Sequence, residues 1–290
     1  MKTGLVLEGG GMRGLYTAGI LDAFIENNIH FDGVIGVSAG AIHGSSFLGG
    51  QKGRTIRYYK EYVNDPRFMS FKNLITTGDY VGEDFCYHEI PEKLDIYDYD
   101  AFTNSSTDFY ATCTNLETGQ AEYLHVTDML KQIDYIRASA SLPYFSKPVE
   151  LNGHLYLDGG CSDSVPVEAF QKMGYDRNVV ILTREKGYKK KAEHTALAAK
   201  TYRKYPNFVK ALENRHINYN KEMKLIEQLE NEGKIFVLRP RSPLCIGRLE
   251  SDVEKLQRIY NIGYADGLRS IKQIKNFLLD SDFKKAPNAF

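Results

Sequence analysis

The sequence lacks an excess of charge of either sign, because its 290 residues carry 37 Lys and Arg against 37 Asp and Glu. A dedicated nucleic-acid-binding protein usually has a basic excess, so this balance argues against that class. Cysteines are few, and the sequence holds no Cys-x-x-Cys pair among Cys86, Cys113, Cys161 and Cys245. This spacing excludes a zinc ribbon and a disulfide scaffold. We expect reduced thiols and no metal site.

Long hydrophobic runs are also absent. The first apolar run, Leu5–Leu7, ends at Glu8 and is too short for a secretory signal. The stretch 33–51 has no Asp, Glu, Lys or Arg, but its six glycines, three serines and His43 make it too polar for a membrane span. We therefore expect a cytoplasmic protein, whose membrane association, if any, is peripheral contact with the inner membrane face.

Strand and helix signals alternate at the start of the chain. Leu5–Leu7 predicts a buried strand, and apolar residues from Leu15 to Ile25 recur at helical spacing. Val34–Val37 predicts a second strand, with another helix from Ala39 onward. This order favours right-handed crossovers and a parallel sheet covered on both faces. We predict a three-layer α/β/α fold with a mostly parallel central sheet.

Further strands are predicted along the rest of the chain, at Phe109–Thr114, Ala121–His125, Pro148–Leu151, His154–Leu157, Asn178–Thr183 and Lys234–Leu238. Asn152-Gly153 is a typical two-residue hairpin turn between two of them. Residues 65–108 are predicted to leave the sheet, as a candidate lid over it. A last long helix is predicted over 249–279, where Gly263 and Gly267 would let a neighbouring helix approach closely.

The stretch 184–224 is strongly basic, with twelve Lys and Arg against four Glu, and it contains Tyr188, Tyr202, Tyr205 and Tyr219. A solvated helical surface is the favoured interpretation. The alternative is contact with anionic lipid head groups, for which Lys189–Lys191 would be the anchor.

A first candidate for chemistry follows the second predicted strand, with the sequence Gly36-Val37-Ser38-Ala39-Gly40. It fits the G-x-S-x-G nucleophile elbow, a sharp strand-to-helix turn that exposes the serine. The helix N-terminus would favour developing negative charge beside that serine. An ordinary glycine-rich turn is the alternative.

A second motif joins the first strand to its helix: Gly9-Gly10-Gly11-Met12-Arg13-Gly14. Backbone N–H groups of such a loop can hold a phosphate or an oxyanion. The string also satisfies the dinucleotide fingerprint G-x-G-x-x-G, but the acid required later, at Asp32, precedes the second strand instead of ending it. Arg13 could orient the loop or bind a phosphate. The alternative is a surface arginine in a salt bridge.

A third motif, Asp158-Gly159-Gly160, follows the predicted hairpin strand. A carboxylate beside glycines is often an ordinary turn former. Cys161 comes next, with no base beside it in the sequence, and is expected to be structural.

In this order and spacing, the three motifs resemble the patatin-like phospholipase family, as does the stretch Arg137–Pro143 before the hairpin. The resemblance covers residues 3–185, which we expect to form the patatin-like catalytic domain. Residues 186–290 would form a helical and strand extension packed on the same domain.

The resemblance implies a lipid acyl hydrolase of the phospholipase A, lysophospholipase or carboxylesterase type, without a cofactor. Ser38 would attack the ester of a lipid, Asp158 would take the serine proton, and the N–H groups of Gly10, Gly11 and Met12 would hold the oxyanion. Two other classes stay open. One is a catalytically silent lipid- or protein-binding member, and the other is a nucleotide-binding protein that uses the glycine-rich loop.

A Ser-His-Asp enzyme would instead need a histidine. His43 lies roughly 140° around its helix from Ser38. His154 shares a strand face with Asp158 but need not reach Ser38, and His194 and His216 lie in the basic stretch. A catalytic histidine is therefore disfavoured.

Overall fold

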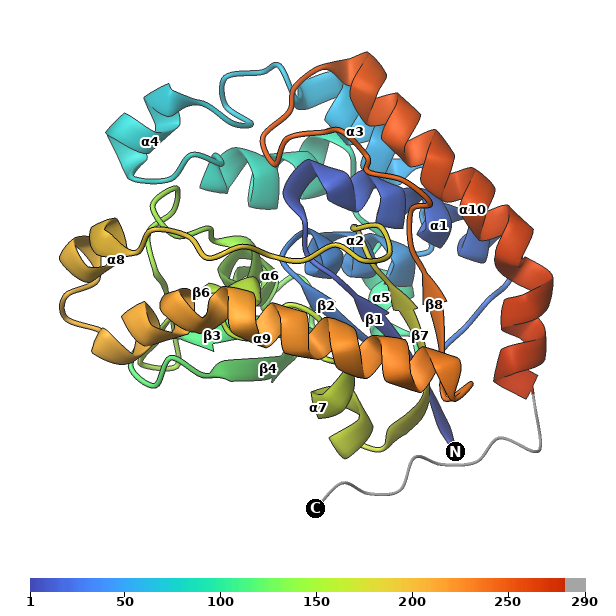
Figure 1. Ribbon diagram of the computed structural model, residues 1–290. Helices are drawn as coiled ribbons and strands as arrows, with labels where there is room; N and C mark the ends of the chain where they lie inside the picture. The colour runs from blue at the N-terminus through green and yellow to red at the C-terminus, as the bar shows by residue number, and fades with distance from the viewer. Residues whose placement is uncertain (280–290) are drawn as a thin grey trace.

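The computed structural model describes residues 1–279, which form one eight-stranded sheet with helices on both sides (Figure 1). The strands are β1 (Lys2–Leu7), β2 (Gly33–Val37), β3 (Asp108–Asn115), β4 (Ala121–His125), β5 (Val149–Leu151), β6 (His154–Asp158), β7 (Tyr175–Ile181) and β8 (Ile235–Leu238). All the predicted strands are confirmed, with ends that differ by a few residues.

The α-helices are α1 (Leu15–Glu26), α2 (Ala39–Leu48), α3 (Arg54–Tyr62), α4 (Phe71–Thr77), α5 (Tyr99–Thr103), α6 (Ile133–Ala140), α7 (Val167–Lys172), α8 (Ala196–Thr201), α9 (Pro206–Asn231) and α10 (Val253–Leu279). Two 3₁₀ turns, η1 (Gly11–Gly14) and η3 (Gly159–Cys161), and a π-helical segment, η2 (Phe85–Leu94), complete the elements. No helix of residues 1–279 is long and apolar enough to cross a membrane.

The centre of the sheet is parallel, as predicted: β3, β2, β1, β7 and β8 run in one direction. Antiparallel pairing is confined to the edge beyond β3, where β4 and β6 pair with β3 and β5 pairs with β6. The hairpin turn between β5 and β6 has positive φ at both Asn152 and Gly153, which is the geometry expected for this dipeptide.

The register of β3 positions the ends of two other strands. Thr112 pairs with Val37 of β2, and the next residue, Cys113, pairs with Asp158 of β6. Both Thr112 and Cys113 also pair with β4. Because a strand has only two sides, β4 occupies one side of β3, and β2 and β6 share the other. These two strands run toward each other and end at the same place.

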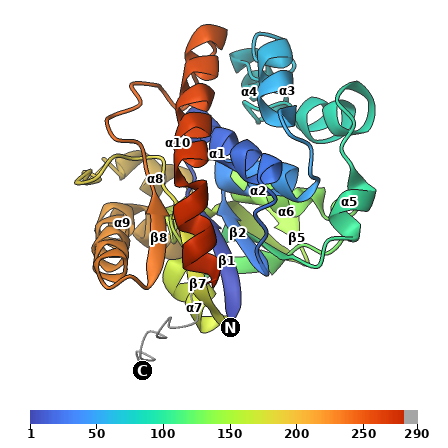
Figure 2. The same cartoon turned by 90° about the vertical axis from the view of Figure 1, so that its right-hand side faces the viewer.

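Hydrophobic side chains alternate across the sheet and form a core on each face. Leu5 and Leu7 pack with α1, α2 and α10, whereas Val6 packs with α7 and α9. Figure 2 shows α1 and α9 on opposite sides of the strands. The three-layer α/β/α prediction is confirmed.

Helix α10 packs closely along α1. A Cβ on Gly263 would lie 1.9 Å from the carbonyl oxygen of Tyr16, and one on Gly267 would lie 2.9 Å from the Cβ of Ala23. The predicted close approach at these two glycines is confirmed. Since β8 extends the sheet beside β7, the C-terminal residues share the core of the N-terminal ones.

Candidate active site

Ser38 lies in the sharp turn between β2 and α2. Its φ of 56° and ψ of −123° are strained for a residue other than glycine. The backbone N–H of Ser38 donates to Ser139 Oγ at 2.9 Å, and Ser139 Oγ donates to the carbonyl of Thr112 at 2.6 Å. A Cβ on Gly40 would lie 2.4 Å from the carbonyl oxygen of Leu7, so this position requires glycine. The turn has the geometry of a nucleophile elbow.

Asp158 is brought to the elbow by the end-to-end arrangement of β6 and β2. Ser38 and Asp158 are both buried and line the same cavity. Asp158 Oδ1 accepts the N–H of Gly160 at 2.7 Å, whereas Oδ2 has no hydrogen-bond partner in the part of the chain that the structure describes. A buried carboxylate oxygen without a donor is suited to accepting a proton from a nearby hydroxyl.

The glycine-rich loop lies directly against this turn. A Cβ on Gly9 would be 3.0 Å from the Cβ of Ser38. Gly11 has a φ of +56°, which favours glycine, and the N–H groups of Gly10 and Gly11 donate to no acceptor within residues 1–279. The N–H of Met12, by contrast, donates to the carbonyl of Arg248 at 3.2 Å. Of the three N–H groups expected to hold the oxyanion, those of Gly10 and Gly11 are therefore free to donate within residues 1–279, whereas that of Met12 is already hydrogen-bonded.

Two residues that sequence analysis did not single out support the site. Arg215 of α9 donates its Nε–H to the carbonyl of Gly160 at 2.6 Å and so holds the turn after Asp158. Glu8, at the end of β1, accepts hydrogen bonds from Thr183 and from the hydroxyl of Tyr219. Burial, followed by the charge of Glu8, raises the pKa of Tyr219 far above its usual value.

Ser38 lies where two cavities of different character meet. One encloses about 140 Å³ and is mainly apolar; the other encloses about 50 Å³ and is lined mostly by glycine, polar and charged residues. Gly11, Ser38, Leu142 and Arg248 line both. A molecule with an apolar chain and a polar end could therefore place the bond between them at Ser38.

The apolar cavity lies between α2, α3, α6 and the segment that leaves the sheet after α3. That segment contributes many of the lining residues: Phe68, Met69, Val81, Cys86, Tyr87, Ile90, Pro91, Tyr97 and Tyr99. The predicted departure of residues 65–108 from the sheet is confirmed up to residue 107, since Asp108 begins β3, and the segment forms a wall of the cavity. Their role as a lid stays a prediction.

The polar cavity includes a residue expected at the surface. Lys190 lines this cavity, and its ammonium lies 4.3 Å from the ring centroid of Tyr219. Lys189 and Lys191, on either side, are exposed. The three lysines therefore do not present one common face, and contact of this segment with a membrane stays a prediction.

Histidines are not part of either cavity. His43 is buried on α2, and its ring packs so closely on the glycine-rich loop that a Cβ on Gly14 would lie 2.9 Å from its Nε2. His154 is exposed and pairs with Glu117 at 3.0 Å. The dinucleotide alternative also lacks its ribose acid, because Asp32 bonds Thr3 at the opposite end of the parallel strands from the glycine-rich loop.

The burial of His43 predicts a pH-dependent stability. Burial lowers the pKa of His43 from 6.5 to about 3, so the folded protein stays unprotonated there while the unfolded chain binds a proton below 6.5. The unfolding free energy is therefore unaffected by His43 above pH 6.5. It decreases as the pH falls from 6.5 toward 3, because protonation of His43 then favours the unfolded chain. Between about pH 7 and about pH 5, the loss of unfolding free energy in the wild type should exceed that in His43→Asn by about 2 kcal/mol.

Urea unfolding at the two pH values measures this difference. The exposed His154→Asn variant is the control and should keep the pH dependence of the wild type. If His43→Asn shows that same dependence, the neutral state of His43 is refuted.

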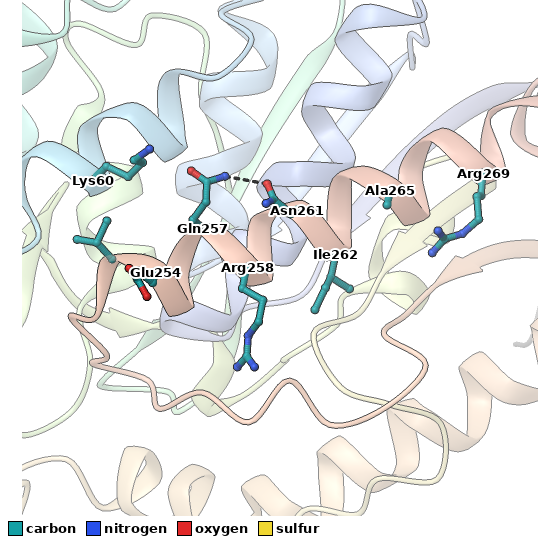
Figure 3. Close-up of a pocket in the computed structure, with 9 residues that line it drawn as sticks. Lys60, Glu254, Gln257, Arg258, Asn261, Ile262, Ala265 and Arg269 are labelled. Carbon is teal, nitrogen blue, oxygen red and sulfur yellow. Dashed lines mark hydrogen bonds between the residues drawn. The ribbon is translucent and has the colours of Figure 1, made fainter.

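The remaining candidates do not carry chemistry. Cys161 is buried, and burial raises the pKa of its thiol to about 12, so it is inert as a nucleophile. A larger open groove of about 620 Å³ runs along the outer side of α10 (Figure 3). Its side chains include Arg258 and a hydrogen-bonded pair, Gln257 and Asn261, but no strained nucleophile or glycine-rich loop.

Comparison with known proteins identifies the family of this chain. A family model described as patatin-like phospholipase matches residues 5–170, which include all three motifs. The chain therefore belongs to the patatin-like phospholipase family, and lipid acyl hydrolysis is the general activity that this family supports. A second model, described as a domain of unknown function (DUF6363), matches residues 205–279.

Individual relatives cover different shares of the chain. The uncharacterized protein YjjU of Escherichia coli is 27% identical over 99% of this chain and 80% of its own length. Lysophospholipase NTE1 of Cryptococcus neoformans is 29% identical over 62% of this chain. The matched region makes up only 11% of the length of that relative. Among solved structures, VipD from Legionella pneumophila matches with a TM-score of 0.44 and 14% identity, over 94% of this chain and 67% of that one. A similarity of that size carries no argument about function.

Proposed function

We propose that this protein hydrolyses the carboxylic ester of a monoacyl lipid through a Ser38–Asp158 dyad. The observation that supports it most strongly is the shared cavity, in which a strained serine meets a buried carboxylate whose Oδ2 has no donor within residues 1–279. The name of the related NTE1 proteins, lysophospholipase, agrees with a monoacyl substrate.

In this mechanism the acyl chain lies in the apolar cavity and the ester carbonyl lies over Ser38. Asp158 takes the Oγ proton as Oγ attacks the carbonyl carbon. The N–H groups of Gly10 and Gly11 receive the oxyanion, a contribution of about 3 kcal/mol per donor in other enzymes. As the tetrahedral intermediate collapses, protonated Asp158 returns its proton to the leaving oxygen, so that the alcohol departs and acyl-Ser38 remains. Asp158, again a carboxylate, then takes a proton from the water that attacks the acyl-enzyme, and the second collapse returns this proton to Ser38 Oγ and releases the fatty acid.

The proposal includes a cytoplasmic location with peripheral membrane contact, since lipid esters lie at membrane surfaces. Phe71 and Ile75 of α4 are exposed, and α4 follows Met69, which lines the apolar cavity. Sedimentation with lipid vesicles tests this contact, which should weaken in a variant with both residues changed to Ser.

Hydrolysis of monoacyl lipids tests the proposed reaction. We expect the wild type to release fatty acid from monoacylglycerol in mixed micelles, and Ser38→Ala to lower that rate by about 10³-fold or more. Ser270→Ala on α10 is the matched control and should retain full activity, because Ser270 lines neither cavity and its hydroxyl donates to the carbonyl of Asp266. Wild-type protein without activity on any lipid ester, or a fully active Ser38→Ala, would refute the proposal.

A further inference from the structure

The polar cavity beside Ser38 is strongly cationic. We call it the cationic pocket, and its charged lining consists of Arg13, Arg184, Lys190, Arg215 and Arg248, with the carboxylates Glu8 and Asp158. The five cations come from four separate parts of the chain: η1, the segment between β7 and α8, α9, and the segment between β8 and α10. In Figure 1 the segment after β7 crosses above α9, toward α8.

Carboxylates offset the charge of these cations only in part. Within residues 1–279, none of the five forms an ion pair. Glu8 is engaged by Thr183 and Tyr219, and Asp158 by the N–H of Gly160. Five cations against the two carboxylates leave the pocket with a net positive charge.

Two of the cations, buried Arg13 and half-buried Lys190, are held in the pocket at a cost. Arg13 is 8% exposed, and its Nε has no hydrogen-bond partner in the described part of the chain. Burial, followed by the charge of Arg184, lowers the pKa of Arg13 to about 10. Burial, followed by the charge of Arg215, lowers the pKa of Lys190 to about 8. Like charges gathered in a buried site destabilise the fold unless an anion binds among them.

The geometry favours a phosphate as that anion. Its several oxygens can accept from donors on different sides, and guanidinium groups bind it through paired N–H bonds. The cavity of about 50 Å³ is far below the roughly 300 Å³ of a pocket for a whole small molecule, so it suits one group of a larger substrate.

The pocket offers little to a cationic head group. The guanidinium of Arg184 lies 4.2 Å from the ring centroid of Tyr188, and Lys190 lies 4.3 Å from that of Tyr219. Both tyrosine rings are thus already paired with cations of the protein. A quaternary ammonium would enter a pocket of five cations and two carboxylates, with neither of these two rings free to bind it.

We propose that the cationic pocket binds the phosphate of an anionic monoacyl phospholipid, one whose phosphate carries no compensating ammonium. This inference rests on the proposed acyl-hydrolase function. Because the two cavities meet at Ser38, a chain in the apolar cavity and a phosphate in the cationic pocket place the glycerol ester between them at the nucleophile.

A comparison of three substrates with one acyl chain tests this specificity. We expect kcat/KM for lysophosphatidate to exceed that for monoacylglycerol and that for lysophosphatidylcholine by about tenfold or more. Lys190→Gln should lower the ratio of kcat/KM for lysophosphatidate to kcat/KM for monoacylglycerol by about fivefold or more. Lys186→Gln is the matched control: Lys186 is exposed on the same segment, outside the cavity, and the ratio should stay unchanged. Equal rates on the three wild-type substrates, or an equal loss in Lys186→Gln, would overturn the inference.

A binding measurement separates this inference from the proposed reaction. Glycerol 3-phosphate should raise the Tm of Ser38→Ala protein, and Lys190→Gln in that background should remove the shift. Inorganic phosphate should give a smaller shift in Tm, since it lacks the glycerol.

The outcomes distinguish the two proposals. If glycerol 3-phosphate gives no shift in Tm, the phosphate subsite is overturned even if esters are hydrolysed. The expected shifts without any Ser38-dependent hydrolysis refute the reaction and leave the subsite standing. Equal shifts with both anions, together with equal hydrolysis of the three substrates, would indicate a free-phosphate site and contradict the head-group assignment.

Discussion

Asp158→Asn is expected to lower kcat by about 10³-fold or more while leaving the fold intact. The amide cannot take the proton of Ser38 Oγ, because Asn has no basic oxygen at neutral pH. Its carbonyl oxygen can still accept the N–H of Gly160, which Asp158 Oδ1 accepts at 2.7 Å, so the turn keeps its shape. The measurement is ester hydrolysis under saturating substrate, with circular dichroism to check folding.

Asp163→Asn is the matched control for this prediction. Asp163 lies five residues farther along and is also hydrogen-bonded, to the hydroxyl of Tyr123 at 2.7 Å, but it does not line the cavity of Ser38. Its variant should keep kcat within about twofold. An active Asp158→Asn would show that another base serves Ser38.

Gly11→Ala is expected to lower kcat by about 10²- to 10³-fold. A Cβ at Gly11 would lie 2.5 Å from the carbonyl oxygen of Arg248, which is backbone and must shift together with the loop. The same carbonyl accepts the N–H of Met12, so the clash displaces the whole row of oxyanion donors. The loss should therefore appear in kcat more than in KM, because an oxyanion forms only in the transition state.

Gly50→Ala separates this clash from the cost of a positive φ. Gly50 has a φ of +65°, close to the +56° of Gly11, but a Cβ there would meet nothing within 4 Å. Its variant should lose a little stability and no measurable activity. Equal activity of the two alanine variants would contradict the role of the glycine-rich loop.

Most of the fold could be predicted from local sequence signals. The parallel strands are short apolar runs between helical patterns, and the hairpin carries its turn residues at Asn152-Gly153. The close contact of α10 with α1 follows from Gly263 and Gly267, because glycines four residues apart leave one helix side free of side chains.

The supporting residues could not be predicted, since they depend on contacts between distant segments. Arg215 and Lys190 belong to a basic stretch whose composition is that of a solvated surface, yet both line the cavity of Ser38. The segment 184–195 contains no helix or strand, so no periodicity indicates which of its lysines is turned inward. Ser139 lies in the stretch Arg137–Pro143, but its bond to the N–H of Ser38 depends on the packing of α6 beside α2 and β3.

The most direct test of the Ser38–Asp158 dyad is covalent labelling with an alkyl fluorophosphonate, followed by mass spectrometry of the digested protein. We expect one adduct, on Ser38, formed about 10³-fold more slowly in Asp158→Asn than in the wild type. The reagent reports the reactivity of the nucleophile without requiring the natural lipid. An adduct on another residue, or labelling of Ser38 at an undiminished rate in Asp158→Asn, would contradict the dyad.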